Sequence, residues 1–122
     1  MTLTILHVED NPLVALTIKD LLEFAGWQVT LCRDGLAALR ELQSATPYDL
    51  LLLDQDVSHL DGFQLIRHAR TLAHRQHTPI IMLSANECGD EARRVGADMF
   101  LQKPEGINRL ASTITRLLHQ AA

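Results

Sequence analysis

Short apolar runs alternate five times along this chain with segments whose apolar residues recur every three or four positions. The runs have the length of β-strands, and the segments between them have the periodicity of helices. The expected strands cover residues 4–8, 27–32, 50–53, 80–83 and 99–102. Such alternation is typical of an α/β fold whose parallel strands are joined by right-handed helical crossovers. The sequence therefore predicts one five-stranded parallel sheet with helices on both faces.

The expected helices begin and end at recognisable residues. Asn11 and Pro12 form a cap and first turn, and Gly26 ends the same helix. The other expected helices are a short one around residues 38–42, one over 61–73, a short one over 90–95 and a last one with its apolar face over 107–118. The run 50–53 consists of four leucines, which indicates a central strand covered on both faces.

A chain of 122 residues is long enough for one domain with its own core, and we expect a single domain over 1–122. Hydrophobic residues make up 47% of the chain and aromatic residues only 4%, so the core must consist mainly of aliphatic side chains. The apolar runs are too short to cross a bilayer, and the first residues lack the pattern of a signal peptide. We therefore expect a cytoplasmic protein without a membrane partner.

The formal net charge of −4 argues against direct nucleic-acid binding, which requires a basic surface. One basic stretch is an exception, and we expect it to coat a solvated helix end rather than bind phosphates. It comprises Arg67, His68, Arg70, His74, Arg75 and His77. Cys32 and Cys88 lack the spacing of a metal site and are expected to be free thiols.

Polar side chains follow four of the five expected strands. Glu9 and Asp10 follow the first strand, Asp54 the third, Ser84 the fourth and Lys103 the fifth. The carboxyl ends of parallel strands meet at one edge of the sheet, where α/β proteins bind their ligands. We therefore expect these side chains to form one site.

The chemistry of this set indicates phosphoryl transfer with a metal ion. Crowded carboxylates repel one another, and a hard cation such as Mg²⁺ relieves that repulsion. Phosphoryl transfer requires mainly positioning and charge neutralisation, which the cation and Lys103 would supply while Ser84 donates a hydrogen bond. Asp54 needs no general base, because an ionised carboxylate is already a nucleophile.

The same residues lie within motifs that cover essentially the whole chain. These are VEDNP at 8–12, LLLLD at 50–54, LDG at 60–62, LSA at 83–85, GAD at 96–98 and LQKP at 101–104. In this order they resemble the receiver domains of response regulators in two-component signalling. The resemblance implies a flavodoxin-like, doubly wound (βα)5 fold with strand order 2-1-3-4-5. It also implies a signalling phosphoacceptor that undergoes self-phosphorylation from a phosphodonor and slow self-dephosphorylation, rather than an enzyme.

By this resemblance, Asp54 is the phosphoacceptor and also a metal ligand. Asp10 would bind Mg²⁺ (or Mn²⁺) directly, Glu9 through water, and Asp56 through its backbone carbonyl. The side chain of Asp56 would also flank the phosphoryl group and tune its lifetime. The resemblance implies a phosphodonor, either a sensor histidine kinase or a His-containing phosphotransfer domain, whereas the downstream effector is not implied.

The resemblance assigns the opposite side of the site to phosphoryl binding and switching. Ser84, Ala85 and Lys103 would hold phosphoryl oxygens, and Phe100 would change rotamer with the switch. Asn86 would flank the phosphoryl group beside the attacking water. Three features depart from the usual pattern: residues 57–58 are Val-Ser instead of Met-Pro, Phe100 replaces a frequent tyrosine, and the segment 84–96 is about one helical turn short.

Other interpretations of the same residues are weaker. Asp54 and Asp56 also form the DxD pattern of haloacid-dehalogenase-type phosphatases, but that pattern follows the first strand in those enzymes and the third strand here. A flavodoxin-like cofactor binder would need a phosphate-cradling loop after the first strand, which this sequence lacks. His7 lies in the first strand and is expected to be a core histidine that points away from the acidic pair, with its polar atoms satisfied.

Overall fold

The computed structural model of this chain describes residues 2–120. Five parallel strands form one sheet in the order β2-β1-β3-β4-β5, which confirms the predicted topology. The strands are β1 (Thr4–Val8), β2 (Gln28–Cys32), β3 (Leu50–Asp54), β4 (Ile80–Ser84) and β5 (Met99–Gln102). The helices in these residues are α1 (Pro12–Phe24), α2 (Gly35–Gln43), α3 (Gly62–Thr71), α4 (Gly89–Val95), α5 (Glu105–Asn108) and α6 (Leu110–Gln120).

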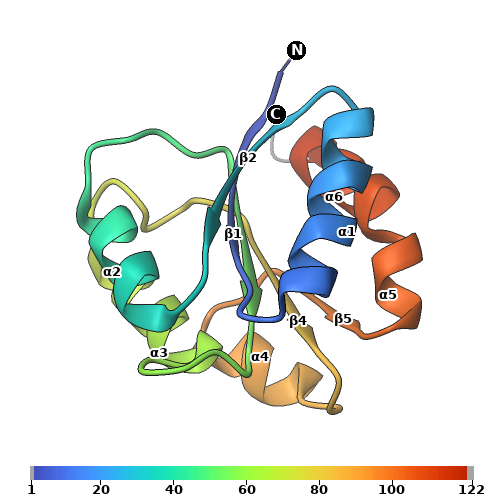
Figure 1. The fold of residues 1–122 in the computed structure, drawn as a ribbon. Helices are drawn as coiled ribbons and strands as arrows, with labels where there is room; N and C mark the ends of the chain where they lie inside the picture. The colour runs from blue at the N-terminus through green and yellow to red at the C-terminus, as the bar shows by residue number, and fades with distance from the viewer. Residues whose placement is uncertain (1, 121–122) are drawn as a thin grey trace.

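Helices cover both faces of the sheet, so the molecule has three layers (Figure 1). On one face, Ile18 and Leu22 of α1 and Ile114 of α6 pack against inward side chains of the strands. On the other face, α2, α3 and α4 contribute small and aliphatic side chains such as Ala38 and Ile66. All five residues of β3 are buried, as expected of the central strand. The sheet thus holds the ends of its strands in a rigid framework.

The last helical region differs from the prediction, because two helices stand where one was expected. The short α5 ends at Asn108, and Arg109 leaves the helical ladder before α6 begins. Gly106 explains why α5 stays close to the sheet: a Cβ atom there would lie 2.7 Å from the Cβ atom of Leu101. Because α5 is held against the end of β5, the chain turns at Arg109, and α6 then runs back along the sheet.

The remaining boundaries shift by one or two residues. The helix predicted over 61–73 ends at Thr71, because Leu72 adopts extended backbone. Trp27 precedes β2 instead of opening it, and Gly89 begins α4 instead of preceding it. The seven residues of α4 make about two turns, as the short segment between β4 and β5 indicates.

The basic stretch that begins in α3 was predicted to be a solvated coat, which holds for the exposed Arg67, His68, His74 and His77 but is wrong for Arg70 and Arg75. Arg75 is only 2% exposed, and its guanidinium donates hydrogen bonds to the carbonyl oxygens of Glu41, Leu42 and Ser44 at the end of α2. Arg70 donates to the carbonyl oxygens of Gly96 and of loop residues before β4. The C-terminal carbonyls of a helix lack partners within the helix, so a buried arginine satisfies them. These two arginines have structural roles.

Both cysteines are free, as predicted. None of the helices described for residues 2–120 is both long and apolar enough to pass through a lipid bilayer.

Candidate functional site

Three carboxylates meet at the carboxyl edge of the sheet. Glu9 and Asp10 follow β1, and Asp54 is the last residue of the neighbouring strand β3. One oxygen atom from each carboxylate lies within 4.8 Å of the others, a spacing that allows all three to bind one metal ion. Glu9 and Asp54 are buried, whereas Asp10 is exposed at the entrance. Oxygen ligands of this kind suit Mg²⁺.

Lys103 places its ammonium group between two of these carboxylates. The Lys103 Nζ atom lies 3.1 Å from Glu9 Oε1 and 3.3 Å from Asp54 Oδ1. Its backbone N–H donates to the Ser84 carbonyl at 2.8 Å, which ties the residue to the end of β4. The structure therefore brings together the carboxylates and the lysine that the sequence placed at separate strand ends.

The site carries surplus negative charge. Burial, with the nearby Asp54 carboxylate, raises the pKa of Glu9 from 4.5 to about 7, although Lys103 acts in the opposite direction. Burial alone would lower the pKa of Lys103, but Asp54 and Glu9 raise it above its usual value. One lysine thus stays charged without fully compensating the carboxylates, and a divalent cation would complete the neutralisation.

We expect the free energy of unfolding, measured without divalent cations, to fall as the pH rises from about 4.5 to about 7. The unfolded Glu9 carboxyl loses its proton near the lower value, whereas the folded one keeps it up to the higher value. Deprotonation in this window therefore favours the unfolded state. Urea denaturation at several pH values would show this fall in the wild type and a weaker one in Glu9→Gln. Parallel pH profiles for the two proteins would contradict the shift.

The residues after β4 and in β5 form the other side of the site. Ser84 is buried, and its hydroxyl oxygen accepts a hydrogen bond from the Asn86 N–H at 3.1 Å. The Ala85 carbonyl accepts a hydrogen bond from the Gln102 side chain at 3.1 Å. Gln102 was not among the predicted site residues, and its position directly before Lys103 is its only signal in the sequence. Phe100 packs against the core beside the start of α4, so closely that a Cβ atom on Gly89 would lie 3.2 Å from the Phe100 ring.

The loop between β3 and α3 carries Asp56 next to the Asp54 carboxylate. The Asp56 N–H lies 3.4 Å from Asp54 Oδ1, and the Asp56 side chain is exposed, as is that of Asn86. Gly35 of α2 packs so closely on this loop that a Cβ atom there would overlap the Leu60 backbone. This contact, with the Gly35 N–H donating to the Ser58 carbonyl at 2.9 Å, holds the loop although it lacks the usual proline.

The expectation for His7 was wrong in two respects. Its side chain is fully buried, but neither ring nitrogen has a hydrogen-bond partner. Side chains two residues apart in a strand lie on the same face, so His7 shares its face with Glu9 instead of pointing away from it.

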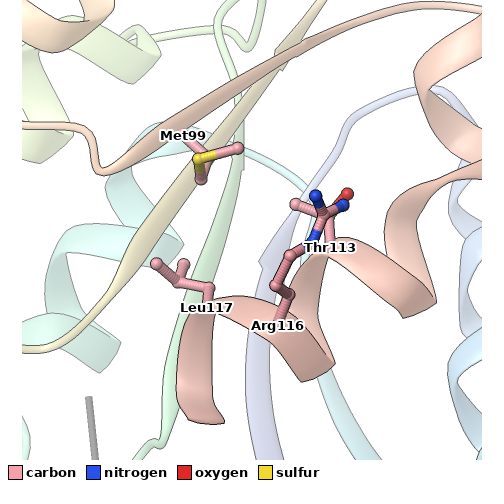
Figure 2. A pocket seen from close by; sticks show the side chains of 4 residues that line it. All are labelled: Met99, Thr113, Arg116 and Leu117. Atoms are coloured by element: carbon pink, nitrogen blue, oxygen red, sulfur yellow. The ribbon is translucent and has the colours of Figure 1, made fainter. Parts of the chain in front are cut away.

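A small cavity of about 150 Å³ lies elsewhere, between β5 and α6 (Figure 2). Its lining residues are Met99, Thr113, Arg116 and Leu117. Met99 begins β5, whereas Lys103 follows its end, so this cavity is not part of the carboxylate site.

A doubly wound sheet with paired acidic residues, an aspartate on the central strand and a lysine after the last strand defines a signalling phosphoacceptor. The family model of the response regulator receiver domain matches residues 5–115 of this chain. The chain therefore belongs to the response regulator receiver domain family of two-component signalling.

Curated relatives agree with this membership. The chain is 36% identical over 119 residues to a gliding motility regulatory protein of Myxococcus xanthus, covering 94% of this chain and 15% of that protein. It is 31% identical over 124 residues to the polar-differentiation response regulator DivK of Brucella ovis, covering 99% of this chain and all of that protein. This chain thus spans only a small part of the first relative and the full length of the second.

Solved structures show the same fold. The receiver domain of the Francisella response regulator 1452 superposes with a TM-score of 0.89 at 28% identity, covering 98% of this chain and 99% of that one. The receiver domain of sensor histidine kinase PA1611 from Pseudomonas aeruginosa PAO1 gives a TM-score of 0.88 at 33% identity, with the same two coverages. In that structure a magnesium ion is coordinated in the active-site cleft.

Proposed function

We propose that Asp54 accepts a phosphoryl group from a phosphohistidine, which a sensor histidine kinase or a His-containing phosphotransfer domain presents. The observation that carries this proposal is the position of the Lys103 ammonium, 3.3 Å from Asp54 Oδ1 at the end of the central strand. A buried aspartate beside a fixed cation suits a nucleophile whose product gains negative charge.

A divalent cation fits the donor set of this site. Glu9, Asp10 and Asp54 would hold Mg²⁺ or Mn²⁺ with carboxylate oxygens, assisted by the backbone carbonyl of Asp56. When bound, the cation supplies the positive charge that phosphoryl transfer requires. The raised pKa of Glu9 supports this assignment, because its causes are the burial of the Glu9 carboxylate and its closeness to the Asp54 carboxylate.

The residues of the chain have separate parts in the transfer. A carboxylate oxygen of Asp54 forms a bond to phosphorus while the bond from phosphorus to the donor imidazole nitrogen breaks, and the imidazole leaves. Lys103, the Ser84 hydroxyl and the Ala85 backbone hold phosphoryl oxygens. The inward Phe100 ring is the group that changes rotamer on switching. The exposed side chains of Asp56 and Asn86 set the lifetime, because they border the path of an attacking water.

The proposal is tested by phosphorylation with a small donor such as acetyl phosphate. We expect intact-mass analysis to show a single added phosphoryl group with Mg²⁺ and none with a chelator. Borohydride reduces an acyl phosphate of aspartate to homoserine, so peptide mass spectrometry after reduction would locate the acceptor. We expect homoserine at position 54 alone.

Two results would overturn this assignment. One is a reduced residue at another carboxylate, such as Asp10 or Asp56, with Asp54 unchanged. The other is equal phosphorylation with and without the chelator, which would mean that the carboxylates do not act through a cation.

A further inference from the structure

His7 has an unusual position for a polar side chain. Its ring is 0% exposed, and in the described part of the chain its two nitrogens are the buried side-chain polar atoms without a hydrogen-bond partner. Buried donors and acceptors without partners destabilise a folded protein, and most proteins avoid them. A state in which this ring gains a hydrogen-bond partner would remove that cost.

The strand geometry places His7 between the apolar core and the carboxylate site. Alternation puts it on the same face of β1 as Ile5 and Glu9. Ile5 belongs to the apolar cluster under α1 and α6, whereas Glu9 contacts Lys103. The register partners of His7 are Leu31 and Leu52, so its neighbours across the sheet are apolar. The ring thus lies between the apolar cluster and the end of β1 that Glu9 follows.

The charge that acts on this ring is that of Lys103. Burial, with the Lys103 charge, lowers the pKa of His7 to about 4. A charge on this fully buried ring would have no partner, so the ring is held in its neutral form, which keeps one nitrogen lone pair that can accept a hydrogen bond.

The Lys103 ammonium group could donate a hydrogen bond to this lone pair. An ammonium group has three donors, and here it contacts oxygens of Glu9 and Asp54. These carboxylates are the groups that would bind a cation. When Glu9 and Asp54 bind a cation, the Lys103 ammonium would lose these carboxylates as acceptors. One of its N–H donors would then contact the phosphoryl group, and another would need a new acceptor.

We propose that His7 is a positioning residue for Lys103, whose ammonium donates a hydrogen bond to the His7 ring once Glu9 and Asp54 have turned to a cation. This contact keeps the ammonium directed at the phosphoryl group on Asp54. The inference rests on the proposed function, and it assigns to a buried strand residue a part in the phosphorylated state.

Nitrogen NMR of protein with ¹⁵N-labelled histidine tests the contact directly. The ring signals of His7 are assigned by their loss in His7→Leu. In the wild type, Mg²⁺ with beryllofluoride, a phosphoryl mimic, should shift the unprotonated ring nitrogen in the direction of a hydrogen-bond acceptor. The same addition at saturating concentration should leave that signal unshifted in Lys103→Met. An unshifted wild-type signal, or an equal shift in Lys103→Met, would overturn the inference.

Binding measurements provide a second readout. Loss of one hydrogen bond to a charged group should weaken beryllofluoride binding about tenfold in His7→Leu. The dissociation constant for Mg²⁺ alone should stay unchanged, because His7 is not a ligand. His7→Gln keeps a polar acceptor and should recover most of the affinity, which a purely structural role would not explain. Wild-type affinity in His7→Leu would contradict the inference.

These outcomes separate the inference from the proposed function. A wild-type protein that binds no beryllofluoride would contradict the proposed function and the inference with it. Binding without the His7 shift would contradict the inference alone.

Discussion

The Lys103→Met variant is expected to bind beryllofluoride about 100-fold more weakly than the wild type at saturating Mg²⁺, because it loses a fixed charge at the phosphoryl group. Its affinity for Mg²⁺ alone should change in the opposite direction. In the wild type, Lys103 Nζ lies 3.1 Å from Glu9 Oε1 and 3.3 Å from Asp54 Oδ1, so it competes with a cation for these carboxylates. Removal of the ammonium leaves the carboxylates to the cation. Titrations of each ligand, followed by calorimetry, would measure both constants.

Lys19→Met is the matched control for this variant. Lys19 pairs with Glu23 on the surface of α1, and exposed pairs of this kind contribute little. We expect wild-type affinities for both ligands in the control. Weaker Mg²⁺ binding in Lys103→Met would mean that Lys103 organises the carboxylates instead of competing with the cation.

The second large effect concerns stability, and we expect Arg75→Leu to lower the free energy of unfolding by about 2–3 kcal/mol. The Arg75 guanidinium donates to three carbonyl oxygens at the end of α2, at 3.0 to 3.2 Å. It also stacks over Tyr48, with 5.1 Å between its central carbon and the ring centroid. Leucine fills much of the volume but removes all of these donors, so that the Leu42 and Ser44 carbonyls keep only the His74 ring nitrogen nearby, at 3.0 and 2.8 Å. Urea denaturation of the purified variant measures the loss.

Arg93→Leu makes the same substitution at an exposed position. The Arg93 side chain is 60% exposed and pairs with Asp90 on the surface of α4, so we expect a change within about 0.5 kcal/mol. Arg75→Lys should be intermediate, because lysine keeps the charge but lacks the planar fork that reaches several carbonyls. Equal unfolding midpoints for Arg75→Leu and Arg93→Leu would contradict the structural role of Arg75.

The carboxylate site was predictable because it depends on strand ends. The position of a side chain at the end of a parallel strand follows from the strand pattern alone, and this pattern places Glu9, Asp10, Asp54 and Lys103 at one edge of the sheet. The five strands follow from the same pattern, whereas their order was implied by the resemblance to receiver domains. The periodicity of the sequence therefore predicts both the fold class and where the reactive side chains lie in the fold.

Other features were not predictable because they depend on distant backbone. Arg75 binds carbonyl oxygens that lie 31 to 34 residues earlier, and carbonyl groups have no signature in a sequence. A basic residue near a helix end therefore looked solvated. His7 was misjudged for a related reason, since the pattern of β1 indicates burial but does not show whether a partner atom is within reach.

The turn at Arg109 that separates α5 from α6 has a mechanical consequence. Lys103 is followed by a helix of only four residues, Glu105–Asn108, and not by one long continuous helix. A displacement of the lysine can be absorbed at the joint after that short helix, while α6 keeps its place on the sheet. We expect α6 to keep its position when Asp54 is phosphorylated. The structural change should then occur in β5, which carries Phe100, and in the adjoining α4.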